Sequence, residues 1–241
     1  MNKILKDVLH HILKNDKIFI PDGFKNVKLD VGLSMNAPNS EAWLQREKNL
    51  IVFGFEPGSA AHESFTYKNK EMSEKYPEYM FINPDRINRT FFPIKCALSN
   101  GEIRQEKLYV TGNDLGCSSL FQPNFFEVID VEEVSVIRLK DFFELFPWNQ
   151  IEYIDHLKID AQGSDFAIIE GAGDYLSKIV YITLENSTGN QYQKNEDYHK
   201  FNQYLSKYDF YLTEESGVNS TYLNTNLVDK LESINFFHLD K

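Results

Sequence analysis

Three acidic side chains come directly after short apolar runs that are typical of buried β-strands. Glu56 follows LIVFGF (residues 50–55), Asp160 follows LKI (157–159), and Glu185 follows IVYITL (179–184). In open α/β sheets, ligands bind at the carboxyl ends of the strands. A carboxylate at such a place can accept a proton from a hydroxyl, bind a divalent ion or accept hydrogen bonds from ribose hydroxyls.

Asp160 and Glu185 are predicted to end neighbouring strands and to face the same cleft. Such a pair can take a proton from a hydroxyl or hold a divalent cation. The alternative is that the two side chains bind loop amides and structural water. Their position favours function, because carboxylates that end central strands are where α/β enzymes keep acids and bases.

The loop after the first apolar run carries polar and glycine residues. Asp30 is followed by Gly32, Ser34 and Asn36, and a helix is predicted to begin soon afterwards. Glycine permits a tight turn and a close approach of a ligand, and the polar side chains with the helix N-terminus offer donors to an anion. The loop lacks the GxGxxG dinucleotide pattern, so a small carboxylate suits it better than a pyrophosphate. An ordinary strand-to-helix turn is the alternative.

Glu56 and Pro57 lie one strand–helix–strand unit after Gly32. Glu56 is therefore expected to neighbour Gly32 on the adjacent strand, where an acidic group accepts hydrogen bonds from both hydroxyls of a ribose. A solvated turn carboxylate is the alternative. Residues 96–100 (CALSN) lie at the end of the next predicted strand and could flank an adenine ring.

Strands and helices alternate around these residues. Strands are predicted at 28–31, 50–55, 92–98, 157–160 and 179–184, with helices beginning near Asn39 or Ser40 and at Ser164, which is expected to cap its helix. This pattern predicts one doubly wound α/β domain over residues 1–241. Residues 1–26 are predicted to form an N-terminal helical extension, and residues 105–140 a hairpin insertion near the active site.

Composition excludes several classes of protein. The chain has 241 residues, 42% of them hydrophobic and 25% charged, as in an ordinary globular protein. Its net charge of −11 disfavours binding to nucleic acid or to anionic lipid. No apolar run is long enough to span a membrane, and the spacing of the two cysteines suggests neither a disulfide framework nor a zinc site. We expect a cytoplasmic protein.

An ordered set of motifs resembles the FkbM family of S-adenosylmethionine-dependent methyltransferases. The matching stretches are LDVG (29–32), GFEP (54–57), CALSN (96–100), SSL (118–120), LKIDAQGSD (157–165), IIEGA (168–172) and ITLE (182–185). The resemblance covers residues 27–225. Two features differ: residues 33–38 replace a small-residue turn of the family, and Gln162 replaces a glutamate.

The resemblance implies a class I methyltransferase fold, mostly parallel, with seven strands of which one is antiparallel. It implies methylation of a hydroxyl on a small-molecule or glycan acceptor, such as a sugar or related natural product. Asp160 would be the base or, with Glu185, a ligand of a divalent cation. The cofactor-binding residues would be Asp30, Gly32, Ser34, Asn36, Glu56, Pro57, Ala97, Leu98 and Ser99. Loops at 68–89, 112–119 and 189–197 are candidates to cover the acceptor.

Two other readings of the residues stay open. A non-catalytic Rossmann-like binding domain would keep the sheet and lose the cofactor. A dinucleotide-dependent oxidoreductase would use Glu56 equally well, although the missing GxGxxG counts against it. A nucleic-acid methyltransferase is rejected, because the fourth strand ends in DAQG rather than in a Pro-Pro-aromatic platform and the net charge is −11.

Overall fold

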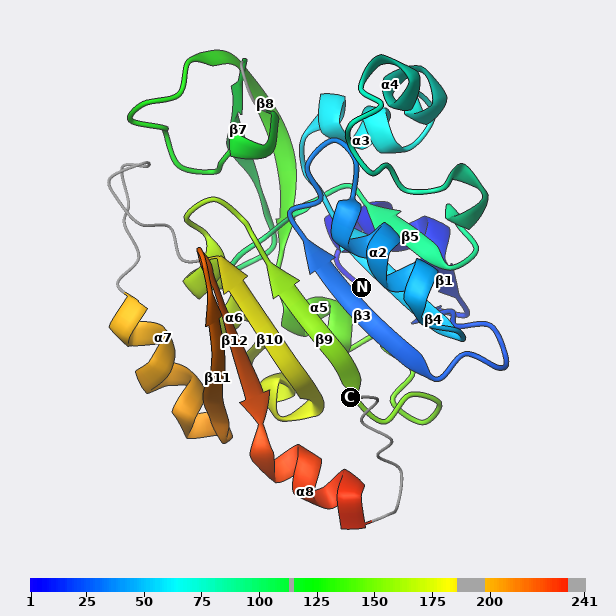
Figure 1. The fold of residues 1–241 in the computed structure, drawn as a ribbon, viewed down its shortest axis with the longest axis vertical. Helices are drawn as coiled ribbons and strands as arrows, with labels where there is room; N and C mark the ends of the chain where they lie inside the picture. The colour runs from blue at the N-terminus through cyan, green and yellow to red at the C-terminus, as the bar shows by residue number, and fades with distance from the viewer. Residues whose placement is uncertain (113–114, 186–197, 234–241) are drawn as a thin grey trace.

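A seven-stranded sheet forms the centre of the computed structural model, which describes residues 1–112, 115–185 and 198–233 (Figure 1). The strand order is β11-β12-β10-β9-β3-β4-β5. Its strands are β3 (Asn26–Val31), β4 (Leu50–Phe55), β5 (Phe91–Ile94), β9 (Ile154–Ile159), β10 (Ile179–Glu185), β11 (Phe210–Ser216) and β12 (Asn219–Asn224). The pairs from β5 to β10 are parallel, and β12 is antiparallel to both of its neighbours. The predicted mostly parallel sheet with one antiparallel strand is confirmed.

Helices lie on both faces of this sheet. In Figure 1, α2 (Pro38–Arg46) covers β3 and β4 from the front, while α5 (Leu139–Phe143) and α6 (Asp165–Ala172) lie behind. Further helices are α3 (Ser59–Phe65), α4 (Asn69–Lys75), α7 (Tyr198–Leu205) and α8 (Thr225–Ser233), with short 3₁₀ turns η2 (Pro84–Arg86), η4 (Gly173–Lys178) and η5 (Ser206–Tyr208). Coverage of both faces explains why β4 is buried along its whole length.

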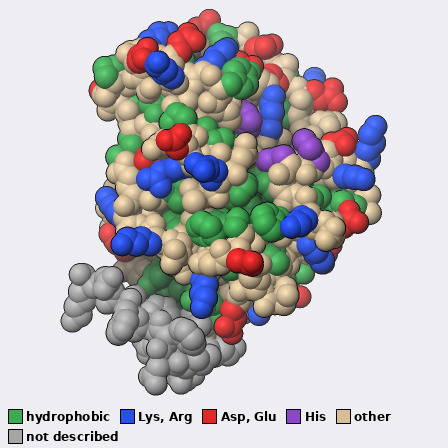
Figure 2. Space-filling model, turned by 90° about the vertical axis from the view of Figure 1, so that its right-hand side faces the viewer, with side chains coloured by type: hydrophobic (Ala, Val, Ile, Leu, Met, Phe, Trp, Pro, Cys, Tyr) green, Lys and Arg blue, Asp and Glu red, His purple; other side chains and the backbone are tan. Residues whose placement is uncertain are grey.

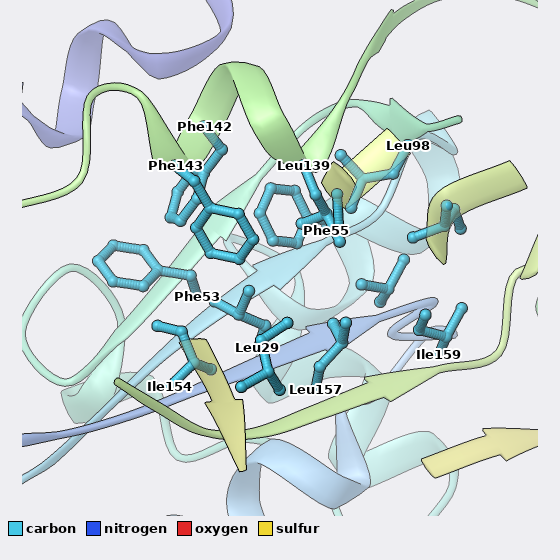
Figure 3. Packing of buried hydrophobic residues seen from close by; sticks show 14 of the residues in the cluster. Leu29, Phe53, Phe55, Leu98, Leu139, Phe142, Phe143, Ile154, Leu157 and Ile159 are labelled. Carbon is cyan, nitrogen blue, oxygen red and sulfur yellow. The ribbon is translucent and has the colours of Figure 1, made fainter. Parts of the chain in front are cut away.

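One hydrophobic cluster lies between the sheet and α5, and a second packs around Leu44 of α2. Figure 3 shows Phe142 and Phe143 of α5 above Phe53 of β4 and Leu157 of β9. The rings of Phe53 and Phe142 are 5.3 Å apart and meet edge to face, a geometry that aromatic pairs favour. This packing fixes the central strands whose ends carry the candidate site.

The chain between β5 and α5 forms a small second sheet. β6 (Ala97–Leu98), β7 (Arg104–Thr111) and β8 (Val128–Ile137) pair in the order β6-β8-β7, and η3 (Leu115–Cys117) lies between β7 and β8. The prediction of one strand over 92–98 is therefore wrong. The backbone turns after Ile94, where the N–H of Cys96 donates to the Ile94 carbonyl, and Ala97 leaves the main sheet to pair with Val136.

The start of two helices also differs from expectation. Ala37, with a positive φ of 49°, caps α2, and Pro38 occupies its first turn, whereas Asn39 or Ser40 was predicted. Ser40 instead donates its hydroxyl to Asp30 at 2.6 Å. Ser164 does precede α6, but its side chain makes no capping hydrogen bond.

The N-terminal residues form more than a helix. α1 (Lys3–Leu9) and η1 (His10–Ile12) lead into a two-stranded hairpin of β1 (Leu13–Lys14) and β2 (Lys17–Ile18). Within the described part of the chain, no helix has the length and apolar character that crossing a membrane requires. On the face shown in Figure 2, lysine and arginine side chains of the described residues are interspersed with aspartate and glutamate.

Candidate active site

Four parallel strands end together at one edge of the sheet. Hydrogen bonds continue the strand pairing one residue past the strands: the Gly32 N–H donates to Phe55, the Glu56 N–H to Ile94, and the Asp160 N–H to Val31. The residues that follow β3, β4 and β9 are therefore held in register by the backbone. In Figure 1 these ends point toward the β7–β8 ribbon.

A cavity of about 360 Å³ opens at this edge. That volume lies within the range of small-molecule sites, roughly 300–1,000 Å³. Of the predicted cofactor-binding residues, six line it: Gly32, Ser34, Glu56, Pro57, Ala97 and Leu98. Asp160 and Glu185, the predicted catalytic pair, line it as well.

Glu56 is the buried acidic group of the cavity. Its Oε2 accepts from the Leu33 N–H at 3.2 Å, and its Oε1 from the Gly58 N–H at 3.0 Å. Burial raises the pKa of Glu56 to about 7, although the N–H groups of Gly58, Leu33 and Ser34 act to lower it. The side chain is thus fixed by backbone donors at the place where an acidic residue binds ribose in related sheets.

The loop after β3 approaches the loop after β9 very closely. Gly32 has φ of +78°, and a Cβ placed on it would lie 1.8 Å from the Asp160 carbonyl oxygen. Ser34 also has a positive φ, 54°. Only glycine fits at position 32, because any side chain would collide with the Asp160 backbone. The absence of a side chain leaves the backbone of this turn, here called the Gly32 turn, open to a ligand.

Asp160 and Glu185 are bridged by the side-chain amide of Gln162. The Gln162 Nε2 donates to Asp160 Oδ1 at 2.6 Å and to Glu185 Oε2 at 3.2 Å. Gln162 has φ of +52°, and Asp165 fixes its loop by accepting from the Ala161 and Gly163 N–H groups, both at 3.2 Å. The glutamine that replaces the family's glutamate is therefore a donor to both carboxylates.

Lys158 gives the carboxylate pair a buried cation. Its Nζ lies 3.1 Å from Asp160 Oδ2, and its side chain is 12% exposed. Alternation along β9 places residues 158 and 160 on the same face of the strand. That period of two is the sequence signal from which Lys158 could have been identified as a site residue.

The two carboxylates differ in proton affinity. Burial acts to raise the pKa of Asp160, but the Lys158 ammonium and hydrogen bonds from Glu185, Lys158 and Gln162 hold it below its usual range. The hydrogen bond to Asp160, together with burial and repulsion from Asp160, raises the pKa of Glu185 to about 8. At neutral pH Asp160 is therefore ionised, and the proton of the pair resides on Glu185.

Three predicted cofactor-binding residues lie outside the cavity lining. Asp30 is buried and accepts from the Ser40 N–H and hydroxyl, so it ties β3 to α2. The Asn36 amide donates to the Met80 carbonyl at 2.9 Å. Ser99 is buried beneath α6, where a Cβ on Gly171 would lie 2.3 Å from its carbonyl oxygen.

The insertion contributes one wall of the cavity. Residues 116–120, together with Leu108 and Phe126, line it, and the Ser119 hydroxyl donates to the Gln162 carbonyl at 2.7 Å. The predicted covering loop at 112–119 thus borders the site through its last residues. No residue of the 68–89 loop is among the described residues that line the cavity, and residues 189–197 lie outside the described part of the chain.

The predicted divalent cation has two carboxylates available to it, Asp160 and Glu185. Within the described ranges, no group of three or more His, Cys, Asp or Glu side chains is arranged to hold a metal ion. The cation stays a prediction.

The strand order, the Gly32 turn and the acid after β4 agree with the predicted class I methyltransferase fold. The sequence model described as the methyltransferase FkbM domain matches residues 36–212. The chain belongs to this family.

Other comparisons give more distant similarities. No curated protein matches. Among solved structures, the CurJ carbon methyltransferase is 9% identical with a TM-score of 0.36, over 84% of this chain and 49% of that chain. The chain therefore spans about half the length of that structure. The 16S rRNA methylase ArmA is 9% identical with a TM-score of 0.34, and the METTL16 methyltransferase domain is 8% identical with a TM-score of 0.33, each over 92% of this chain and 81% of that chain.

The cavity is compatible with S-adenosylmethionine. Among the lining residues, Glu56 would offer a carboxylate to the ribose, Gly32 and Ser34 would leave backbone accessible, and Ala97 and Leu98 would supply small and apolar surface for a ring. When bound, this cofactor supplies a methyl group made electrophilic by a sulfonium.

Proposed function

We propose that the protein methylates a hydroxyl oxygen of a sugar, a glycan or a related small natural product. The observation that carries the proposal is the Asp160–Gln162–Glu185 cluster at the cavity. A hydroxyl nucleophile must lose its proton as it attacks, and an ionised carboxylate at that point accepts it.

Asp160 is the proton acceptor in this scheme. Its pKa is held low, so it is ionised at neutral pH, and Lys158 stabilises that charge at 3.1 Å. Glu185 and Gln162 orient the carboxylate by hydrogen bonding. Such general base catalysis contributes typically about 100- to 10,000-fold, and alignment of the reactants contributes the larger share.

Glu56, Gly32 and Ser34 hold the cofactor. Glu56 accepts hydrogen bonds from the ribose hydroxyls, and the Gly32 turn leaves room for the methionine part. Pro57, Ala97 and Leu98 border the rest of the ligand in this proposal. Asp30, Asn36 and Ser99 support the loops that carry these residues.

The test is methyl transfer from S-adenosylmethionine with a trideuterated methyl group. The purified protein is incubated with matched compounds that differ in one group, such as glucose and glucosamine, and with neutral glycans and hydroxylated polyketides. The proposal predicts a deuteromethyl ether, located by mass spectrometry and NMR, which forms about 100- to 10,000-fold more slowly with Asp160→Asn. Label on nitrogen or carbon, or on ribosomal RNA alone, would contradict it.

A further inference from the structure

Ser164 lines the cavity but its hydroxyl is unused by the folded protein. The residue is 2% exposed, and its Oγ is a buried atom with no hydrogen-bond partner in the part of the chain that the structure describes. It stands at the N-cap of α6, where serine normally accepts from a backbone N–H, yet it makes no such bond.

A buried hydroxyl without a partner is destabilising. Its removal from water is not compensated, whereas alanine at the same place would avoid this cost. Other buried hydroxyls do find partners: Ser119 donates to the Gln162 carbonyl, and Ser40 donates to Asp30. Such an unpaired polar group in a cavity wall lowers the stability of the free protein, and it is expected where the group binds a ligand.

The position of Ser164 indicates which part of a ligand it meets. It follows β9, whose end contacts the Gly32 turn of β3, while Glu56 follows β4 on the far side of β3. Strands lie about 4.8 Å apart, so the ends of β9 and β4 are about 10 Å apart. A cofactor whose ribose is bound by Glu56 therefore extends its other end toward the loop of Ser164.

The exposure of the lining residues distinguishes the part of the cavity near the mouth, where the acceptor would enter, from the deeper part, where the cofactor would bind. Glu185 is half-buried, and the Asp160 side chain is 30% exposed, so these groups lie at the mouth through which an acceptor enters. Ser164 lies deeper. Resting on the proposed function, we propose that the Ser164 hydroxyl binds the amino-acid end of S-adenosylmethionine and supplies a hydrogen bond that the free protein does not make.

The experiment compares Ser164→Ala with the wild type by calorimetry and by thermal unfolding. The two ligands are S-adenosylhomocysteine and methylthioadenosine, which lacks the amino-acid end. The proposal predicts that Ser164→Ala raises the Kd of S-adenosylhomocysteine by about 3- to 10-fold, the worth of one hydrogen bond. It also predicts an unchanged Kd for methylthioadenosine and an equal or higher Tm for the free variant.

Tyr222→Phe is the matched control. Tyr222 is 1% exposed, lies on β12 outside the cavity lining, and donates its hydroxyl to Asn202 Oδ1 at 2.8 Å. This control is expected to lower the Tm of the free protein and to leave both Kd values unchanged.

Three results would overturn the inference. If the wild type binds S-adenosylhomocysteine and Ser164→Ala leaves its Kd unchanged, Ser164 does not contact the ligand. The proposed function would then stand without this inference. An equal rise in the Kd of S-adenosylhomocysteine and of methylthioadenosine would show that Ser164 does not bind the amino-acid end. Failure of the wild type to bind S-adenosylhomocysteine would remove the proposed function and, with it, this inference.

Discussion

Gly32 packs directly against the backbone of Asp160. A methyl group on residue 32 would lie 1.8 Å from the Asp160 carbonyl oxygen, and residue 32 has φ of +78°. The turn that precedes α2 and the carboxylate proposed as base are therefore positioned by one contact between neighbouring strands. Under the proposed function, the positions of cofactor and acceptor both depend on Gly32.

Gly32→Ala is expected to destabilise the free protein by more than about 2 kcal/mol. The left-handed conformation costs an alanine roughly 1–2 kcal/mol, and the clash with Asp160 adds to it. Gly217→Ala is the control, because Gly217 has φ of +60° and nothing within 4 Å of its Cβ position. Urea unfolding of both variants measures the difference. Equal losses would show that the contact with Asp160 is not tight.

The free energy of unfolding is expected to fall as pH rises between about 4.5 and 7, in part through Glu56. Burial raises the pKa of Glu56 to about 7, above the value of 4.5 for the unfolded chain. The stabilisation is therefore full below pH 4.5 and lost as pH rises through 7, with a size on the order of 3 kcal/mol.

Glu56→Gln isolates this contribution, because glutamine does not titrate. Asp155 and Asp165, with pKa values raised by burial to about 7 and about 6, titrate in the same window in both proteins. The measurement is urea unfolding of wild type and variant from pH 4.5 to 8. Identical slopes would show that Glu56 is ionised throughout this range.

Lys158 and Asp160 are expected to be strongly coupled. Removal of one partner leaves the other charge without its counter-ion, and solvent at the 30% exposed Asp160 side chain offsets part of that cost. Lys158→Met and Asp160→Asn should each destabilise the protein, and the double variant should lose about 1–3 kcal/mol less than the sum. A double-mutant cycle in urea measures this, and strict additivity would contradict the contact at 3.1 Å.

Asp160→Asn is expected to lower kcat about 100- to 10,000-fold with little change in the Kd of S-adenosylhomocysteine. Glu185→Gln should have a smaller effect, because glutamine can still hydrogen bond to Asp160. Both kcat values are measured with the acceptor found in the deuteromethyl screen. Full activity of Asp160→Asn would exclude Asp160 as the base.

Much of the sheet could be predicted because its signal is local. Continuous apolar runs such as 50–55 and 179–184 indicate strands covered on both faces, and acidic residues that end them indicate the ligand edge. Glu56, Asp160 and Glu185 were found in this way, and all three line the cavity.

Contacts between distant segments could not be read from the sequence. Ser119 reaches Gln162 only because β7 and β8 fold back over the sheet edge. Asn36 was expected at the ligand, but its side chain bonds to Met80. Ser164 was expected to cap α6, and its unused hydroxyl becomes evident only when all its neighbours are known.

The central claim is that the cavity binds S-adenosylmethionine through Glu56. Thermal unfolding with S-adenosylhomocysteine, and separately with NAD, tests it most directly. A ligand at about 100 times its Kd adds roughly 2.7 kcal/mol of stability, or about 5–10 °C in Tm for a domain of this size. The account predicts that shift with S-adenosylhomocysteine alone and its loss in Glu56→Ala. No shift, a shift with NAD, or a shift that survives in Glu56→Ala would contradict it.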